Sequence, residues 1–263
     1  MGSKGLNINS KTIFSTGNIM SINDITKKPS QSSTQELIDA IKYTLKDYTA
    51  KNLNSTEQAD HFKVISRPED DVQTKIQENR LEELKIGLKL FLTDDNEFPL
   101  KEALEIVLHH QLKVSSVADV IVCFKKPLSV ERRDNLNVIK NIWKILESYV
   151  DNGSVGELGI ADIEEATFRE LYDWAKVKPV IIQINLATCC VVPPTLQTFC
   201  KEKDIKLFTH SDSSDILPDQ SIEEIFSAPL DLVWAVRFTV HIKCRGVLTT
   251  KGYCLCLNPK FEI

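Results

Sequence analysis

The sequence predicts an α/β fold, a (β/α)8 TIM-type barrel, because short apolar runs alternate with longer stretches of helical period from about residue 85 onward. The apolar runs lack regular polar alternation, as expected for parallel strands that are buried on both faces. A helix between successive strands is the signature of a parallel sheet covered by helices, which a chain of this length most easily closes into a barrel. An open doubly wound sheet is the alternative.

Five strands and four helices follow one another along this part of the chain. The expected strands are residues 85–92, 117–124, 155–161, 180–186 and 205–211. The expected helices are one whose first turn holds Pro99, one along the apolar stripe from Ile139 to Val150, one capped by Asp162 with Glu165, and one beginning at Pro193 and Pro194.

Two more helices are expected outside this alternation. Ser33 and Glu36 frame a capping box for an N-terminal helix. A stripe made of Leu232, Val236, Phe238 and Ile242 predicts a helix that ends at Gly246.

The domain organisation follows from the remaining segments. We expect residues 1–11 to be a flexible tail and residues 12–263 to form a single barrel domain. The polar stretch at about 51–80 is interpreted as a surface loop or insert. Residues 246–257 either close the barrel or leave its C-terminal end incomplete or atypical.

Composition and charge exclude several classes of function. The 263 residues include 32 lysines and arginines against 37 acidic residues, a net charge of -5, so nucleic acid is not an expected partner. No apolar run is long enough to span a bilayer, so no membrane association is expected. Seven cysteines in a chain without an export signal indicate reduced thiols and a cytoplasmic location. The nine glycines form no phosphate-binding motif.

Several segments in the middle of the chain resemble an aldo-keto reductase barrel. They are Asn152-Gly-Ser-Val-Gly-Glu-Leu-Gly-Ile160, the run 168–179 that begins Phe-Arg-Glu-Leu-Tyr-Asp-Trp, Gln183-Ile-Asn-Leu186 and Leu207-Phe-Thr-His210. The resemblance implies a barrel of the aldo-keto reductase kind and places Lys89 at the position of the family's lysine.

A narrower resemblance, strongest over residues 150–257, is to the regulatory (modifier, light-chain) subunits of glutamate-cysteine ligase. The segments that carry it include Trp174-Ala-Lys-Val-Lys-Pro179, residues 183–190, Lys243-Cys-Arg-Gly246 and Lys251-Gly-Tyr253. It implies a non-catalytic subunit that forms a heterodimer with the catalytic (heavy) subunit in the first step of glutathione biosynthesis. Such a subunit raises the affinity of its partner for glutamate and relieves feedback inhibition by glutathione. The alternatives are an NADPH-dependent aldo-keto reductase and a stand-alone thiol redox sensor.

The set of residues that a working reductase needs is incomplete in this sequence. Such an enzyme uses a tyrosine as proton donor, a lysine and an aspartate that lower the pKa of this tyrosine, and a histidine that orients the substrate. Lys89 is retained, but residues 51–80, where the aspartate and the tyrosine belong, contain no tyrosine. Phe124 or Lys125 stands where the family has its histidine. We therefore expect no catalytic residue and no cofactor. For the remnant positions Lys89 and Gln183 we favour packing and hydrogen bonding, with weak nucleotide binding as the alternative.

The other cofactor positions have also changed. Ala161 and Asp162 replace the Ser-Asn pair that holds the nicotinamide carboxamide in the family, and His210 replaces the aromatic ring that stacks on nicotinamide. The lysine and arginine signature for the adenosine phosphate is not visible after Gly246.

The cysteines offer sites for contact with a partner. Cys189 and Cys190 follow an expected strand, and Cys244 lies in the Lys-Cys-Arg-Gly stretch. The resemblance makes an intersubunit disulfide plausible for these three, while Cys189 and Cys190 could equally be small buried hydrophobes. We place the partner interface near residues 187–194 and 243–253.

A metal site is not expected. Cys254 and Cys256, with His210 and His241, do not form a complete set of four zinc ligands at a recognised spacing.

Overall fold

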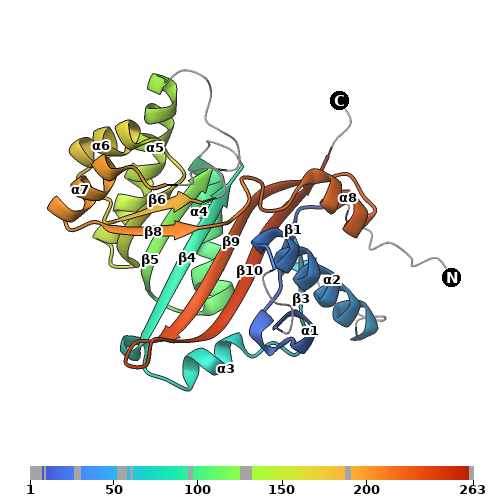
Figure 1. The fold of residues 1–263 in the computed structure, drawn as a ribbon. Coiled ribbons are helices and arrows are strands. Elements are labelled where there is room, and N and C mark those ends of the chain that lie inside the picture. Colours follow the sequence, from blue (N-terminus) through green and yellow to red (C-terminus); the bar gives the residue numbers. More distant parts are fainter. Residues whose placement is uncertain are drawn as a thin grey trace.

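One ten-stranded sheet organises the protein (Figure 1). The computed structural model describes residues 8, 10–26, 31–51, 58–59, 62–93, 97–124, 132–186 and 191–260. The order of the strands in the sheet is β2-β3-β1-β10-β9-β4-β5-β6-β7-β8. The strands are β1 (Thr12–Ser15), β2 (Gln58–Ala59), β3 (Phe62–Ser66), β4 (Leu84–Leu92), β5 (Val117–Phe124), β6 (Val155–Ala161), β7 (Ile181–Asn185), β8 (Lys206–His210), β9 (Leu230–Ile242) and β10 (Val247–Pro259).

The expected strand and helix alternation from residue 85 onward is confirmed. Strands β4 to β8 pair in parallel in chain order, and each lies within one residue of its expected bounds. The helices between them are α4 (Glu97–Glu105), which continues as the π-helical segment η3 (Ile106–Leu112), α5 (Arg132–Asp151), α6 (Glu165–Trp174) and α7 (Pro194–Glu202). This half of the sheet therefore has the parallel α/β architecture expected for a (β/α)8-type barrel.

The C-terminal part is atypical for such a barrel. The stripe Leu232, Val236, Phe238 and Ile242, expected to form a helix, lies in β9, so that expectation is wrong. Strands β9 and β10 form a long antiparallel hairpin, and β9 also pairs antiparallel with β4. Gly246 lies in the hairpin turn with φ 61°, where its missing side chain permits a left-handed backbone.

Two apolar cores lie on opposite faces of the sheet. Neighbouring residues such as Leu90 and Phe91 of β4 belong to different cores, as the alternation of side chains along a strand requires. One core packs the strands against α4 to α7. The other packs β1, β9 and β10 against α1 (Asn23–Thr26), α2 (Ser33–Lys51) and α8 (Asp219–Phe226), which lie near β1 and β10 in Figure 1.

Part of the segment 51–80, expected to be a surface loop or insert, forms regular secondary structure. Residues 62–66 form β3, which pairs in parallel with β1 and thereby extends the sheet. Residues 72–77 form α3 (Val72–Gln77), whose Val72 and Ile76 are buried. The last residues of the expected tail are also ordered, since Ile8 is buried and Lys11 forms an ion pair with Glu102.

Two expected helix caps are replaced by other contacts. The hydroxyl of Ser32, one residue before α2, accepts a hydrogen bond from the backbone N–H of Gln35, whereas Glu36 bonds to residues of β10. Helix α6 begins at Glu165 after Glu164, so Asp162 is not its cap. No helix of the described residues is both long and apolar enough to cross a membrane.

The close approach of two backbones at Gly252 predicts a sensitive position. A β-carbon at Gly252 would lie 2.1 Å from the carbonyl oxygen of Gly17 and 2.4 Å from Cζ of Phe238. We expect Gly252→Ala to lower the free energy of unfolding by about 3 kcal/mol, since backbone cannot move aside easily. Urea unfolding measures this loss. The control Gly153→Ala, with φ 79° but no atom within 4 Å, should lose only the left-handed backbone cost of about 1 kcal/mol. Equal losses would contradict the steric explanation.

Candidate functional site

A buried ion pair joins β4 to the segment after β8. Lys89 lies on β4 with 4% of its surface exposed, and its Nζ donates hydrogen bonds to Asp212 Oδ2 at 2.7 Å and to Gln183 Oε1 at 2.8 Å. Asp212 follows β8 by two residues and is buried to a similar degree. The structure thus brings together Lys89 and Gln183, the two remnant positions identified from the sequence.

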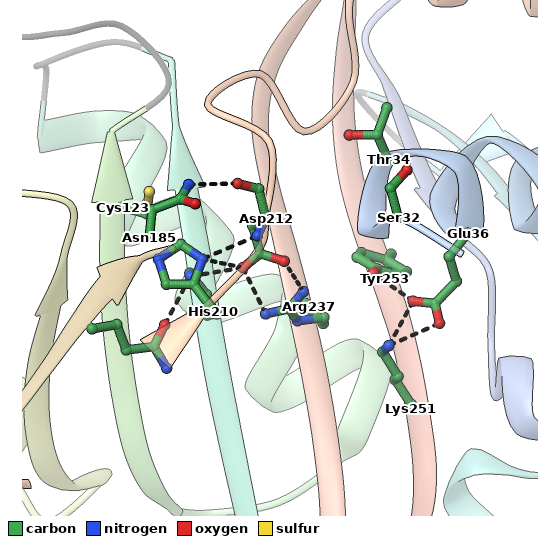
Figure 2. Close-up of polar contacts among 12 residues, drawn as sticks. Ser32, Thr34, Glu36, Cys123, Asn185, His210, Asp212, Arg237, Lys251 and Tyr253 are labelled. Atoms are coloured by element: carbon green, nitrogen blue, oxygen red, sulfur yellow. Dashed lines mark hydrogen bonds and ion pairs between the residues drawn. The ribbon is translucent and has the colours of Figure 1, made fainter. Parts of the chain in front are cut away.

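Arg237 completes the neutralisation of this carboxylate. It is paired with Lys89 in the antiparallel register of β4 and β9. Its guanidinium binds both carboxylate oxygens of Asp212, at 2.6 and 2.9 Å, in the bidentate geometry that arginine favours (Figure 2). The backbone carbonyl of Asp212 accepts a hydrogen bond from Asn185 Nδ2 at 2.7 Å. One acidic residue is therefore held from β4, β7 and β9.

His210 bridges two carboxylates at the end of β8. Its Nε2 lies 2.9 Å from Asp162 Oδ1, and its Nδ1 lies 3.1 Å from the backbone N of Asp212 and 3.3 Å from Asp212 Oδ2. The neutral ring can accept the Asp212 N–H at Nδ1, whereas the protonated ring can donate to the Asp212 carboxylate. Asp162 has φ 61°, a backbone conformation that aspartate tolerates better than most residues.

The electrostatics of the cluster follow from burial and from these contacts. Burial alone would raise the pKa of Asp212, but hydrogen bonds from His210 and Arg237 and the nearby positive charges hold this pKa well below its usual range. Burial opposes protonation of His210, yet hydrogen bonds to Asp162 and Asp212 raise the pKa of the ring above its ordinary value. Burial raises the pKa of the Cys123 thiol to about 12, so this cysteine, whose Sγ lies 3.4 Å from Asp162 Oδ2, is a protonated thiol.

A second polar cluster lies beside the first, across β10. The hydroxyl of Tyr253 donates to Glu36 Oε1 at 2.8 Å, and Lys251 Nζ binds the same carboxylate (Figure 2). Burial raises the pKa of Tyr253 strongly. This tyrosine is therefore a neutral phenol that ties β10 to α2.

Lys89 and Tyr253 are bonded to different partners. Lys89, at the family's lysine position, bonds to Asp212 and Gln183, while the hydroxyl of Tyr253 bonds to Glu36. Phe124 ends β5 where the histidine belongs, and Lys125 lies outside the described residues.

Two of the family's cofactor positions are bonded to other residues of the chain. The side-chain oxygen of Gln183 accepts from Lys89, and an oxygen of Asp162 is engaged by His210. One polar atom of each residue is thus engaged by an internal hydrogen bond. These contacts hold strands of the sheet together.

The residues expected to contact a partner differ in where they lie. Cys189 and Cys190 lie outside the described residues, and so does most of the expected interface at 187–194. Cys244 is an exposed thiol in the turn between β9 and β10. Tyr253, at the far end of the other expected interface segment, is fully buried, so that end of the segment belongs to the core.

The remaining thiols and histidines do not gather into a metal site. Cys254 and Cys256 are buried, and burial raises the pKa of Cys256 to about 12. Within the part of the chain that the structure describes, no three histidine, cysteine or acidic residues are arranged to hold a metal ion.

Sequence reasoning missed Asp212, whose carboxylate neutralises Lys89, and Arg237, whose guanidinium shares that carboxylate. Asp212 lies in the polar run 211–215, where nothing distinguishes it from a solvated loop residue. Arg237 was hidden within the segment assigned to a helix. Its signal was a single charge inside an apolar run, which in a strand often marks a buried ion pair.

The comparisons with known proteins agree with one another on the family. The model of the aldo/keto reductase family matches residues 70–212. The chain is 29% identical over 248 residues to the human protein named glutamate--cysteine ligase regulatory subunit, covering 91% of this chain and 90% of that protein. It is 26% identical over 206 residues to a putative glutamate--cysteine ligase regulatory subunit of Schizosaccharomyces pombe, covering 67% of this chain and 72% of that protein.

Two solved structures of aldo-keto reductases are also similar to parts of the chain. One, from a deep-sea metagenome library of the Medee basin, is 19% identical with a TM-score of 0.42, covering 52% of this chain and 48% of that chain. The other, from the silkworm Bombyx mori, is 23% identical with a TM-score of 0.41, covering 53% and 43%. The chain thus spans about half of each of these structures.

The buried pair of Lys89 and Asp212 should be strongly coupled. Asp212→Asn leaves Lys89 and Arg237 without their shared carboxylate and should cost about 3 to 5 kcal/mol of unfolding free energy, whereas Lys89→Met leaves Asp212 paired with Arg237 and should cost less. The double variant should lose much less than the sum of the two losses, as measured by denaturant unfolding in a double-mutant cycle. Lys101→Met, which breaks the exposed pair of Lys101 and Glu97, is the control and should change stability by less than about 1 kcal/mol. Additive losses at Lys89 and Asp212 would show that the two side chains act independently.

The raised pKa of His210 predicts a pH-dependent contribution to stability. A group with a raised folded-state pKa stabilises fully below its unfolded pKa, about 6.5 for histidine, and loses this contribution as the pH rises through the folded value. The stability difference between the wild type and His210→Gln should therefore be largest near pH 5.5 and smaller at pH 8.5, as measured by urea unfolding. Asp162→Asn, which removes one carboxylate that favours the protonated ring, should reduce this pH dependence. A difference that is constant with pH would refute the assignment.

Proposed function

The chain belongs to the aldo/keto reductase family, and we propose that it uses this fold as a non-catalytic regulatory subunit of glutamate-cysteine ligase. In this role it binds the catalytic subunit as a heterodimer, raises the affinity of that subunit for glutamate and relieves its feedback inhibition by glutathione. The relatives that carry the name of this regulatory subunit align over about nine-tenths of the chain, which supports the proposal.

The observation that carries the proposal is the state of Lys89. In a reductase this lysine lowers the pKa of a proton-donating tyrosine. Here Nζ of Lys89 is bonded to Asp212 and Gln183, and the hydroxyl of Tyr253 is bonded to Glu36. Loss of a general acid typically removes two to four orders of magnitude in rate. A family lysine bonded to Asp212 and Gln183, with the hydroxyl of Tyr253 bonded to Glu36 instead, favours a binding function over hydride transfer.

A stand-alone thiol sensor is less well supported. A reactive thiol needs a low pKa and access to solvent. Burial instead raises the pKa values of the Cys123 and Cys256 thiols to about 12 and also raises that of Cys200. Cys244, which is exposed, is better suited to contact a partner, and with Cys189 and Cys190 it remains our candidate for an intersubunit disulfide.

The proposed mechanism is differential binding. A subunit that strengthens glutamate binding by its partner must itself bind more tightly to the glutamate-loaded partner, because coupling between two ligands is reciprocal in free energy. The chain needs no chemical step for this effect. It needs a surface that distinguishes two states of the catalytic subunit.

Titration of the two purified subunits, with and without saturating glutamate, tests this mechanism. We expect glutamate to lower the Kd of the subunit pair by about 5- to 150-fold, the usual range of such coupling. Isothermal calorimetry measures the two Kd values, and aspartate in place of glutamate serves as a control ligand. Equal Kd values with and without glutamate would exclude the mechanism. Turnover of aldehydes with NADPH by the chain alone would exclude the non-catalytic assignment.

A further inference from the structure

Strand β8 is the last strand of the sheet, beyond β7. The next strand in the chain, β9, does not continue from β8 but pairs with β4 on the far side of the five parallel strands. Among the described residues, no strand pairs with the outer edge of β8. An uncovered edge offers its backbone N–H and C=O groups to another chain.

The backbone groups that face this edge can be assigned from two hydrogen bonds to the β7 side. The N–H of Lys206 donates to the carbonyl of Val180 at 2.8 Å, and the carbonyl of His210 accepts from the N–H of Leu186 at 2.9 Å. Because a strand turns alternate residues to opposite neighbours, Lys206 and His210 bond towards β7. The N–H and C=O groups of Leu207 and Thr209 therefore point away from the sheet.

The side chains of β8 are exposed to an unusual degree for a parallel strand. Such strands are normally buried on both faces, and every residue of β4 is buried or half-buried. On β8, Phe208 has 45% of its surface exposed, and Lys206 and Thr209 are exposed as well. An exposed phenylalanine on an uncovered edge strand is a feature of strand-addition sites.

A groove with an excess of positive charge opens beside this edge. Phe208 and Gln183 line a cavity of about 430 Å³ on the sheet, between the edge strand and the start of the hairpin turn. Its charged lining residues are Lys85, Lys89, Arg237 and Lys243, with Asp119 as the acidic one. Asp119 pairs with Lys85, and Asp212 is shared by Lys89 and Arg237.

The charge of Lys243 remains without an acidic partner. Its Nζ donates to the carbonyl oxygen of Glu82 at 2.9 Å, and no carboxylate of the described residues pairs with it. Asp212 carries one negative charge, whereas Lys89 and Arg237 together carry two positive charges. With the charge of Lys243, the groove keeps a positive excess that an acidic segment would complement.

We propose that an extended segment of the catalytic subunit adds to the outer edge of β8, bonds to the backbone of Leu207 and Thr209, and places acidic and apolar side chains over the groove beside Phe208. This inference rests on the proposed function and names the surface through which the partner binds. A second copy of the chain fits less well. In an antiparallel self-pair the added strand would be Lys206–His210, which contains no acidic residue to complement the charge of the groove.

Hydrogen exchange of the wild-type complex is the direct test. Addition of purified catalytic subunit should slow exchange of the Leu207 and Thr209 amides by at least about tenfold, because both become hydrogen-bonded. Light scattering of the chain alone, at the same concentration, checks for self-association. Binding without protection of these two amides would overturn the proposal, and so would the same protection arising in a homodimer. Failure of the wild-type chain to bind the catalytic subunit would instead refute the proposed function.

Two pairs of variants test the edge independently. Thr209→Pro removes an outward N–H and should raise the Kd for the catalytic subunit by about tenfold, while Thr209→Val keeps the N–H and should bind like the wild type. Phe208→Glu adds a negative charge beside the groove and should weaken binding by a similar factor, while Phe208→Leu should not. Thermal unfolding of each variant identifies a loss of fold. Folded Thr209→Pro and Phe208→Glu variants with unchanged Kd values would refute the edge as the binding site.

Discussion

The carboxylate of Asp212 is the contact on which the arrangement of the site depends. Lys89 and Arg237 lie opposite each other on β4 and β9, and two buried cations in that position would repel each other. Asp212 binds both and so makes the pairing of these strands compatible with burial. Because Asp212 lies two residues after β8, the same ion pairs anchor the end of the last strand to the centre of the sheet. Loss of this carboxylate would affect strands on both sides of it.

The contacts of Lys89 join distant parts of the sheet. The lysine lies at the strand position where the sequence resemblance places the family's lysine, and its charge links β4 to Asp212. Gln183, another position of the family's cofactor site, is bonded to it. The phenol of Tyr253, on β10, is committed to Glu36. Lys89, Gln183 and Tyr253 are thus bonded within the protein, and these contacts tie β4 to β7 and β10 to α2.

Local pattern was sufficient for the parallel half of the fold. The runs 117–124 and 155–161 coincide with β5 and β6, because buried parallel strands separated by helices leave an unambiguous pattern. The same reasoning failed for β9. Leu232, Val236, Phe238 and Ile242 are separated by four, two and four residues, and these even spacings fit a strand as well as a helix. Val233 and Ala235 lie between them and are also apolar, so the apolar and polar alternation typical of a strand was not visible.

The amino-acid sequence was enough to establish the family, the parallel strands and the places of Lys89 and Gln183, because these depend on short segments whose hydrophobic period and residue types are local properties. The partner of Lys89 could not be read from the chain, since Asp212 lies 123 residues away and becomes its neighbour only when β4, β7 and β9 pack around it. The same holds for the free edge of β8. Whether a strand lies at the edge of a sheet depends on where the next strand of the chain pairs. Here β9 pairs with β4, which leaves β8 at the edge.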